Sequence, residues 1–227
     1  MEITKKNDFI EIRFTGRTFG EIFDSNTEDI KKVDKESKVP EKGAIIAIGQ
    51  GMVVKGLDIS LENKEIGKSY DVVVSKMDGF GERRKELVKT IPLKVFTERR
   101  IMPQAGMILN LDDMLVKVSA VSGARVIVDF NNPLAGKELN YHVTIVRKVE
   151  DEKEKVEALF KYMFKFVPEF EIADKIKVKG PKIIEAYVKS FSEKFKELVG
   201  KELEFIEIKN EKKEENNKEK VEVKAEQ

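Results

Sequence analysis

Two different spacings of apolar residues divide this chain into two parts. Before about residue 150, apolar and polar residues alternate in segments such as Phe9–Gly16 and Tyr70–Ser75, and this period of two is typical of half-buried strands. From Asp151 onward, apolar residues recur at every third or fourth position, which is the period of an amphipathic helix. The pattern therefore predicts an α+β protein.

The first segment, Phe9–Gly16, places Ile10, Ile12 and Phe14 on one face and charged residues on the other. A strand with one buried face and one solvent-exposed face has this pattern. The segment Thr27–Pro40 that follows is polar and rich in lysine, without a periodic apolar face. We expect it to be a surface loop.

The stretch Gly43–Gly81 has the pattern of an apolar binding pocket. Ala44–Ile48 predicts a short buried strand, and the spacing of apolar residues in Met52–Leu61 predicts a short helix with one apolar face. That face is expected to pack against a strand at Tyr70–Ser75. The loop Asp78–Gly81 then holds one aromatic ring between two glycines, which permit unusual backbone angles.

A second group of elements is predicted between this stretch and residue 150. Alternating apolar residues predict strands at Met107–Leu111, Met114–Val121, Arg125–Phe130 and Leu139–Arg147. Arg84–Thr90 is expected to form a charged turn or short helix, and Ile91–Phe96 is expected to be a loop. The elements up to Phe130 suffice for a small β domain inserted into a loop of the first one, and Leu139–Arg147 is expected to return as the last strand of that first domain.

The last part of the chain predicts two helices and a small sheet. The first helix is expected from Val156 to Pro168, where proline would stop it. The second is expected from Pro181 to Gly200, because proline suits the first turn of a helix and glycine its end. Leu203–Ile208 is expected to be a strand that pairs with Phe170–Val178. About sixty residues shield many aromatic side chains poorly, so we expect this part to form a homodimer or to grip other chains.

Composition narrows the possible functions. The chain has 227 residues, of which 41% are hydrophobic and 37% charged, a net charge of +1, no cysteine and one histidine. These values exclude disulfides and cysteine-ligated metals and give no basic field for nucleic acid. We expect no metal, no cofactor, no nucleic acid and no membrane partner, and we expect a cytoplasmic protein. The lysine and glutamate tail from Lys209 to Gln227 is expected to be disordered.

Four short motifs resemble those of the FKBP-type peptidyl-prolyl cis-trans isomerases. The motifs are Phe23-Asp24-Ser25, Met52-Val53-Val54-Lys55-Gly56-Leu57-Asp58, Asp78-Gly79-Phe80-Gly81 and Leu134-Ala135-Gly136-Lys137-Glu138-Leu139-Asn140-Tyr141-His142-Val143. They resemble, in order, the F-D-S motif of the family, its E-V-I-x-G-(W/L)-E helix, its A-Y-G loop and the L-A-G-x-x-L-x-F-x-V last strand of the SlyD-like branch. The similarity covers about residues 3–150, and the chain looks like a long archaeal-type form with an extra C-terminal domain.

The resemblance implies an FKBP-like antiparallel half-barrel around a short helix. It assigns residues 1–83 and 131–150 to an isomerase domain, and residues 84–130 to an insert-in-flap domain that binds unfolded chains in the SlyD-like branch. Residues 151–208 would form a separate α/β domain, followed by the tail at 209–227.

The resemblance also implies the site residues. Asp24, Phe23, Val54, Phe80 and Tyr141 would be catalytic, with the backbone N–H of Val54 holding a substrate carbonyl and Asp24 polarising the edge of the pocket. Phe14, Val53 and Leu57 would bind the substrate. Each of these apolar residues taken alone is better explained by core packing, and only the ordered set of motifs favours a binding role. Phe14 and Phe80 stand where the family usually has tyrosines, so two hydroxyls are absent.

The implied function is peptidyl-prolyl isomerisation with chaperone activity on unfolded, proline-containing polypeptides. The chaperone surface would comprise Ile101, Met102, Met107, Leu109 and Met114, because flexible thioethers suit a surface with many partners; alternatively, the methionines fill the core of a small domain. A holdase without turnover is the alternative function, and ribosome or nucleic-acid attachment through lysine-rich segments is a third. His142 is expected to be a surface or hydrogen-bonded side chain.

Overall fold

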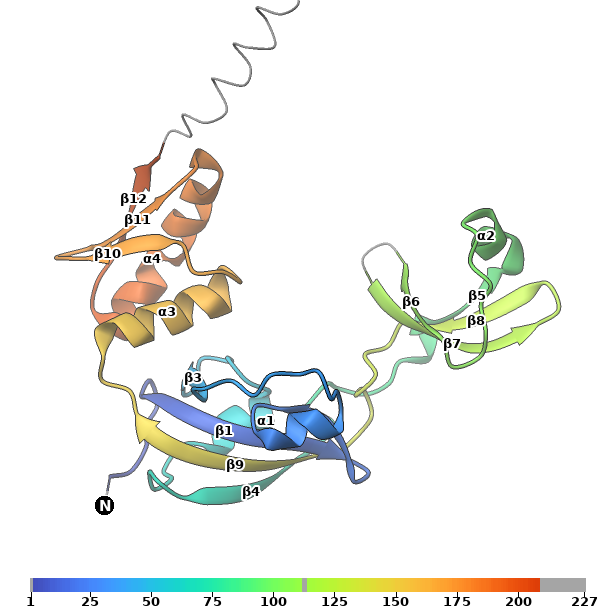
Figure 1. The fold of residues 1–227 in the computed structure, drawn as a ribbon, viewed down its shortest axis with the longest axis horizontal. Helices are drawn as coiled ribbons and strands as arrows, with labels where there is room; N and C mark the ends of the chain where they lie inside the picture. The colour runs from blue at the N-terminus through green and yellow to red at the C-terminus, as the bar shows by residue number, and fades with distance from the viewer. Residues whose placement is uncertain (1, 112–113, 209–227) are drawn as a thin grey trace, which may run out of the picture.

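The computed structural model describes residues 2–111 and 114–208, and within them it contains three β-sheets. Each sheet has its own hydrophobic core. In Figure 1 the second sheet extends to one side of the first, to which two chain segments connect it, and the third lies beside the first. The chain is therefore a mixed α/β structure, as the apolar spacing predicted, and its first two sheets are antiparallel throughout.

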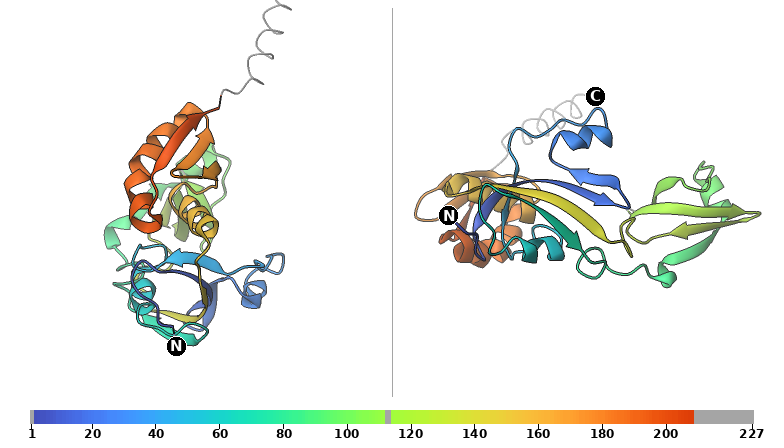
Figure 2. Two further views of the ribbon diagram at one scale, coloured as in Figure 1. Left: turned by 90° about the vertical axis from the view of Figure 1, so that its left-hand side faces the viewer. Right: turned by 90° about the horizontal axis from the view of Figure 1, so that it is seen from below.

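The first sheet has five strands, ordered β2-β1-β9-β4, with β3 paired to β1. The strands are β1 (Phe9–Thr18), β2 (Glu21–Ser25), β3 (Ala44–Ala47), β4 (Ser69–Val74) and β9 (Leu139–Lys148). All neighbouring strands are antiparallel, and β9 lies between β1 and β4. The sheet curves in the two views of Figure 2, and its concave side holds the helix α1 (Lys55–Ser60).

Helix α1 is attached to the first sheet by apolar packing and to the preceding turn by a carboxylate. Leu57 and Leu61 are each 1% exposed. The two carboxylate oxygens of buried Asp58 accept hydrogen bonds from the N–H groups of Gly49 and Gly51, each at 2.8 Å. Both glycines have positive φ angles, 78° and 68°, which glycine adopts without steric cost. The sequence thus fixes the turn that precedes α1.

One charge on β1 is buried, contrary to the prediction of a solvent-exposed charged face. Glu11 is 6% exposed. Its carboxylate accepts hydrogen bonds from Gly43 N–H and from Arg147 Nε, both at 2.7 Å. Burial of a carboxylate is tolerable because these donors replace water. The short 3₁₀ helix Glu28–Lys32 lies within the segment predicted to be a surface loop.

The second sheet has the order β5-β8-β7-β6 and is antiparallel throughout. Its elements are a 3₁₀ helix at Lys85–Leu87, β5 (Val88–Pro92), α2 (Leu93–Glu98), β6 (Ile108–Leu111), β7 (Met114–Ser122) and β8 (Arg125–Asp129). The prediction of a loop at Ile91–Phe96 is wrong. Pro92 ends the strand and occupies the N-cap position of α2, and Phe96 is 1% exposed in the core of the second sheet.

The last part of the described chain contains a three-stranded sheet covered by helices. Its elements are α3 (Glu152–Met163), β10 (Glu169–Ile172), β11 (Ile176–Gly180), a 3₁₀ helix at Lys182–Ile184, α4 (Glu185–Val199) and β12 (Leu203–Glu207). β11 pairs antiparallel with β10 and parallel with β12. α3 ends five residues before Pro168, where it was predicted to end, because Lys165 adopts a positive φ of 64°.

The aromatic residues of this last part are shielded partly by the first sheet. Phe160 and Phe195 are fully buried, and their cluster includes Phe9 and Ala47 of the first sheet. Other apolar side chains stay exposed, among them Ile183 at 79%. The predicted tail at 209–227 lies outside the described residues. Across residues 2–111 and 114–208, no helix combines the length and apolar character needed to cross a bilayer.

Candidate functional site

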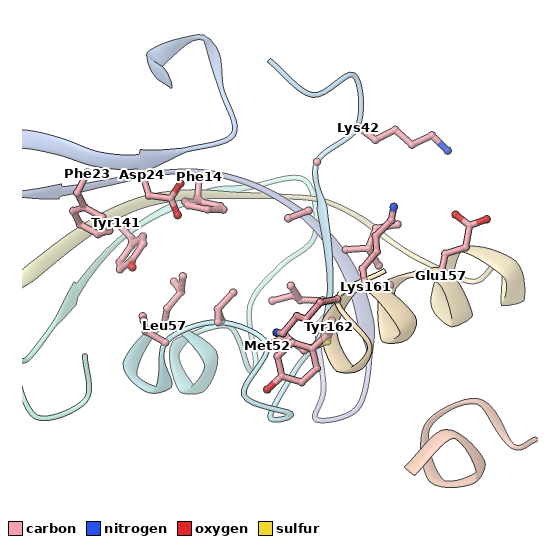
Figure 3. Close-up of a pocket in the computed structure, with 18 of the residues that line it drawn as sticks. Phe14, Phe23, Asp24, Lys42, Met52, Leu57, Tyr141, Glu157, Lys161 and Tyr162 are labelled. Atoms are coloured by element: carbon pink, nitrogen blue, oxygen red, sulfur yellow. The ribbon is translucent and has the colours of Figure 1, made fainter. Parts of the chain in front are cut away.

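A cavity of about 950 Å³ lies between the concave face of the first sheet, α1 and α3 (Figure 3). It contains all eight residues that the family resemblance implied. Its lining consists of Phe14, Phe23, Asp24, Lys42, Gly43, Ala44, Ile45, Ile46, Met52, Val53, Val54, Leu57, Phe80, Leu134, Tyr141, Glu154, Glu157, Ala158, Lys161, Tyr162 and Lys165. The fold thus gathers residues from Phe14 to Lys165 around one space.

Three aromatic rings form one end of this cavity, which we call the aromatic end: Phe14 on β1, Phe23 on β2 and Tyr141 on β9. The ring centroids of Phe23 and Tyr141 lie 5.7 Å apart in an edge-on arrangement, and those of Phe14 and Tyr141 lie 6.1 Å apart. Gly16 makes this close packing possible, because a Cβ atom there would lie 2.6 Å from the Phe23 ring.

The turn before α1 holds a backbone N–H without a protein acceptor on Val54, a residue that lines the cavity. Val54 occupies the N-cap position of α1, and its carbonyl accepts from Asp58 N–H at 3.0 Å. Within residues 2–111 and 114–208, no protein group accepts a hydrogen bond from the N–H of Val54. A donor without an acceptor beside an apolar surface is suited to bind a carbonyl oxygen.

Two polar groups at the aromatic end influence each other. Burial raises the pKa of the Asp24 carboxyl, and a hydrogen bond from the backbone of Ser25 opposes that shift. Burial, together with the negative charge of Asp24, raises the pKa of Tyr141 to about 12. Tyr141 therefore keeps its phenolic proton at neutral pH and brings a hydroxyl to an end of the cavity where Phe14 has none.

Helix α3 forms the opposite wall, which the sequence did not reveal. The Tyr162 hydroxyl donates to the Gly51 carbonyl at 2.9 Å, and Lys42 forms an ion pair with Glu154 at 2.7 Å. The signal in the sequence is a stripe at positions 154, 158, 161 and 162, which share one face of α3. Nothing in the sequence indicates that this stripe faces the first sheet.

The five residues expected to form a chaperone surface separate into two sets. Ile101, Met107 and Leu109 are partly buried and pack against the core of the second sheet. Met102 and Met114 are 75% and 53% exposed. Ile108 and Leu115 were missed by sequence reasoning and are 64% and 69% exposed. Met107 therefore packs against a core, as the alternative interpretation expected, whereas Met102 and Met114 are exposed to solvent.

His142 is exposed on β9, and its Nδ1 lies 2.8 Å from Asp71 Oδ1. This position matches the surface, hydrogen-bonded side chain that the sequence predicted. Among the described residues, no group of three or more His, Asp or Glu side chains is arranged to hold a metal ion.

Comparison with known proteins identifies the protein family in which this cavity occurs. The family described as FKBP-type peptidyl-prolyl cis-trans isomerase matches residues 2–97, and the family described as FKBP26, IF domain, matches residues 89–134. Together the two matches cover residues 2–134, which include four strands of the first sheet, β1 to β4, and all of the second sheet. The chain belongs to the FKBP-type peptidyl-prolyl cis-trans isomerase family, which confirms the family and the enzyme class inferred from the sequence.

Individual relatives agree with this family. A short-type peptidyl-prolyl cis-trans isomerase from Methanocaldococcus jannaschii is 27% identical over 149 residues, which are 64% of this chain and 94% of the relative. The SlyD isomerases of Yersinia pestis and Escherichia coli K12 are each 34% identical, over 48% and 43% of this chain. The match spans 57% and 52% of these two SlyD proteins, about half of their length.

Proposed function

We propose that this chain accelerates the cis–trans isomerisation of X-Pro bonds in unfolded polypeptides by removing water from the amide in the cavity. The observation that carries this proposal is that one cavity is lined both by the aromatic end, Phe14, Phe23 and Tyr141, and by Val54, whose N–H has no acceptor among the described residues. The proline ring would occupy the aromatic end, with Leu57, Val53 and Phe80 completing its apolar surroundings. The Val54 N–H would hold the substrate carbonyl.

The physical basis is the resonance of the X-Pro amide. Its rotation barrier is about 18–20 kcal/mol because the C–N bond is partly double. Resonance places charge on the planar ground state, so water stabilises that state more than the twisted transition state. A dry aromatic cavity removes this preference, and about 1.4 kcal/mol of differential stabilisation gives each tenfold increase in rate. Asp24 would orient the dipole of the rotating amide at the rim.

The test is a protease-coupled isomerisation assay with a proline peptide, applied to the whole chain and to the Phe23→Leu variant. We expect the whole chain to accelerate the reaction and Phe23→Leu to lose about tenfold in kcat/KM, because the ring that contacts Tyr141 is removed. Phe19→Leu is the matched control, since Phe19 is 84% exposed and outside the cavity lining. Absence of acceleration, together with suppressed aggregation, would instead favour the holdase alternative.

We further propose that residues 84–130 form a domain that retains unfolded chains beside the cavity. The ends of this segment lie next to each other, which supports a separable unit. Asn131 accepts a hydrogen bond from Arg84 N–H at 2.8 Å and donates to the Arg84 carbonyl at 2.9 Å. A chain in which a short loop replaces residues 84–130 should keep its activity on short peptides and lose acceleration of proline-limited refolding. Equal loss in both assays would contradict this division of labour.

Residues 151–208 are proposed to form the third unit and to pair two copies of the chain. Support comes from exposed apolar side chains on this part, such as Ile183 at 79% and Tyr187 at 56%. Light scattering should give a dimer mass for the whole chain and a monomer mass for Ile183→Glu. Ile108→Glu is a matched control in the second sheet, where Ile108 is 64% exposed. A monomer mass for the unmodified chain would reject the pairing.

A further inference from the structure

The cavity is longer than the binding of a proline ring requires. Its volume of about 950 Å³ is near the upper limit of ordinary ligand pockets, about 300–1,000 Å³. The aromatic end occupies one side, and α3 with the segment before β3 forms the other. If the proposed isomerase function holds, residues of the client on one side of the proline must lie along α3.

Three sets of contacts hold α3 against the cavity. Its apolar face shares a buried cluster with Phe9 and Ala47 of the first sheet. Tyr162 donates to the carbonyl of Gly51, in the turn that leads to Val54. Glu154 accepts from Arg147 at 2.8 Å and pairs with Lys42 at 2.7 Å, while Arg147 also binds buried Glu11. The helix is therefore a built wall of the cavity.

The charges on this wall differ in the groups that they contact. Lys42 is paired with Glu154, and the ammonium of Lys165 lies 5.1 Å from the centre of the Tyr162 ring. Lys161 and Glu157 line the same wall, and neither belongs to an ion pair within residues 2–111 and 114–208. Lys161 is one helical turn nearer than Glu157 to Tyr162 and to the turn that presents the Val54 N–H. In Figure 3 Lys161 lies on the cavity side of α3, between Glu157 and the aromatic end.

We propose that α3 is the second wall of the client-binding cavity and that Lys161 selects clients with an acidic side chain flanking the X-Pro bond. The carboxylate of Asp24 lies at the aromatic end, opposite Lys161. An acidic client side chain is repelled from the first group and attracted to the second. The two charges together give the bound polypeptide a direction along the cavity.

The experiment uses peptides with one central proline in which a single glutamate is moved through three positions on either side. Each is compared with the same peptide carrying glutamine, and the readout is the ratio of the two kcat/KM values. For the unmodified chain we expect glutamate to be favoured about two- to fivefold at one or more positions, the size of an exposed ion pair. The preference should decline between 20 mM and 500 mM salt, because salt screens exposed charges.

The variants are Lys161→Gln, Lys161→Glu and the control Lys153→Glu. We expect Lys161→Gln to abolish the glutamate preference and Lys161→Glu to reverse it. Lys153 is an exposed lysine of the same helix outside the cavity lining, so Lys153→Glu should keep both the preference and the rate on the glutamine peptides. That control separates a local contact from a change in net charge.

The outcomes also separate this proposal from the proposed function. No acceleration of any peptide by the unmodified chain would remove the isomerase function itself. Acceleration of the glutamine peptides, with no position at which glutamate is favoured or with a preference that persists in Lys161→Gln, would overturn the role of Lys161 and leave the isomerase intact. An equal change in Lys153→Glu and Lys161→Glu would likewise overturn it.

Discussion

The cavity of the first sheet and the surface of the second sheet both offer apolar side chains, but in opposite geometries. Phe23 and Tyr141 line a concave space, where the proposed function requires an amide to lose its water. Met102 and Leu115 instead project into solvent, 75% and 69% exposed. Among the described residues, neither lines the cavity of the first sheet. Catalysis of rotation requires enclosure, whereas retention of an unfolded chain requires only exposed, adaptable apolar area. The proposed isomerase and chaperone functions would thus use two different surface shapes of one protein.

The largest effect is expected when only the second sheet is unfolded, which tests whether the cavity of the first sheet works without it. Phe96→Ala removes a ring that is 1% exposed in its core, and such truncations cost about 3–5 kcal/mol. We expect a separate low-temperature transition in calorimetry, while turnover of short peptides persists. Val95→Ala, on the same helix and 40% exposed, is the control. Loss of peptide turnover in Phe96→Ala would mean that the two sheets do not act independently.

A methyl group can disturb the aromatic end without touching the second sheet. In Gly16→Ala the new Cβ would lie 2.6 Å from the Phe23 ring and 3.0 Å from the Tyr141 ring. The rings must separate, so we expect about a tenfold loss of kcat/KM, equivalent to about 1.4 kcal/mol. Gly123→Ala is the counterpart in the second sheet, where φ is +55° and the space is open. It should lower stability and leave peptide turnover unchanged.

Restoring a hydroxyl would sharpen the role of the cavity. Phe80 lines the cavity and is 37% exposed, where the family commonly has tyrosine. Phe80→Tyr should tighten the binding of a macrolide inhibitor about three- to tenfold, because one hydrogen bond contributes about 0.5–1.5 kcal/mol. Fluorescence titration measures this affinity. An unchanged affinity would mean that the ring does not reach the ligand.

Polar replacements on the second sheet test the other half of the comparison. In the double variant Met102→Ser and Leu115→Ser we expect about a twofold weaker suppression of aggregation of a denatured protein. Stability should stay within about 0.5 kcal/mol, as is usual for surface substitutions. Peptide turnover should be unaffected, since neither residue lines the cavity. Unaltered suppression would move the chaperone surface elsewhere.

The smallest effect concerns the rim carboxyl. The pKa of Asp24 is raised above 3.8 by burial, so ionisation costs free energy in the folded chain and folding is favoured as pH falls through the folded-state pKa. Asp24→Asn removes this term. We expect the variant to gain no more than about 0.5 kcal/mol at pH 7, and the gain should vanish towards pH 3. A gain that grows on acidification would reverse the sign of the argument.

Regular alternation explains why most of the fold could be predicted from the sequence. Strands such as β1 and β9 are long, apolar on one face and bounded by turn residues, so local pattern and tertiary structure agree. The helix α2 was missed because Pro92 suggested a loop, although proline also begins helices. The burial of Glu11 was missed because the groups that cover it, Gly43 and Arg147, are distant in sequence.

The candidate site also has one part that the sequence predicted and one part that it did not. Motif order located the aromatic end and the α1 turn, because those residues lie within strands and turns of recognisable spacing. The wall formed by α3 depends on how one helix docks on another part of the chain. That docking depends on the buried cluster that apolar residues of α3 share with Phe9 and Ala47. It also depends on the hydrogen bond from Tyr162 to Gly51, and no local sequence pattern encodes either contact.

The bond between Tyr162 and Gly51 makes the turn that presents the Val54 N–H a shared property of two distant segments. By thermodynamic reciprocity, a ligand that stiffens this turn must also strengthen the docking of α3, and a contact that pulls α3 away must weaken that ligand. A contact made on the far side of α3, such as the proposed pairing with a second copy, would then change the residence time of a proline-containing ligand in the cavity.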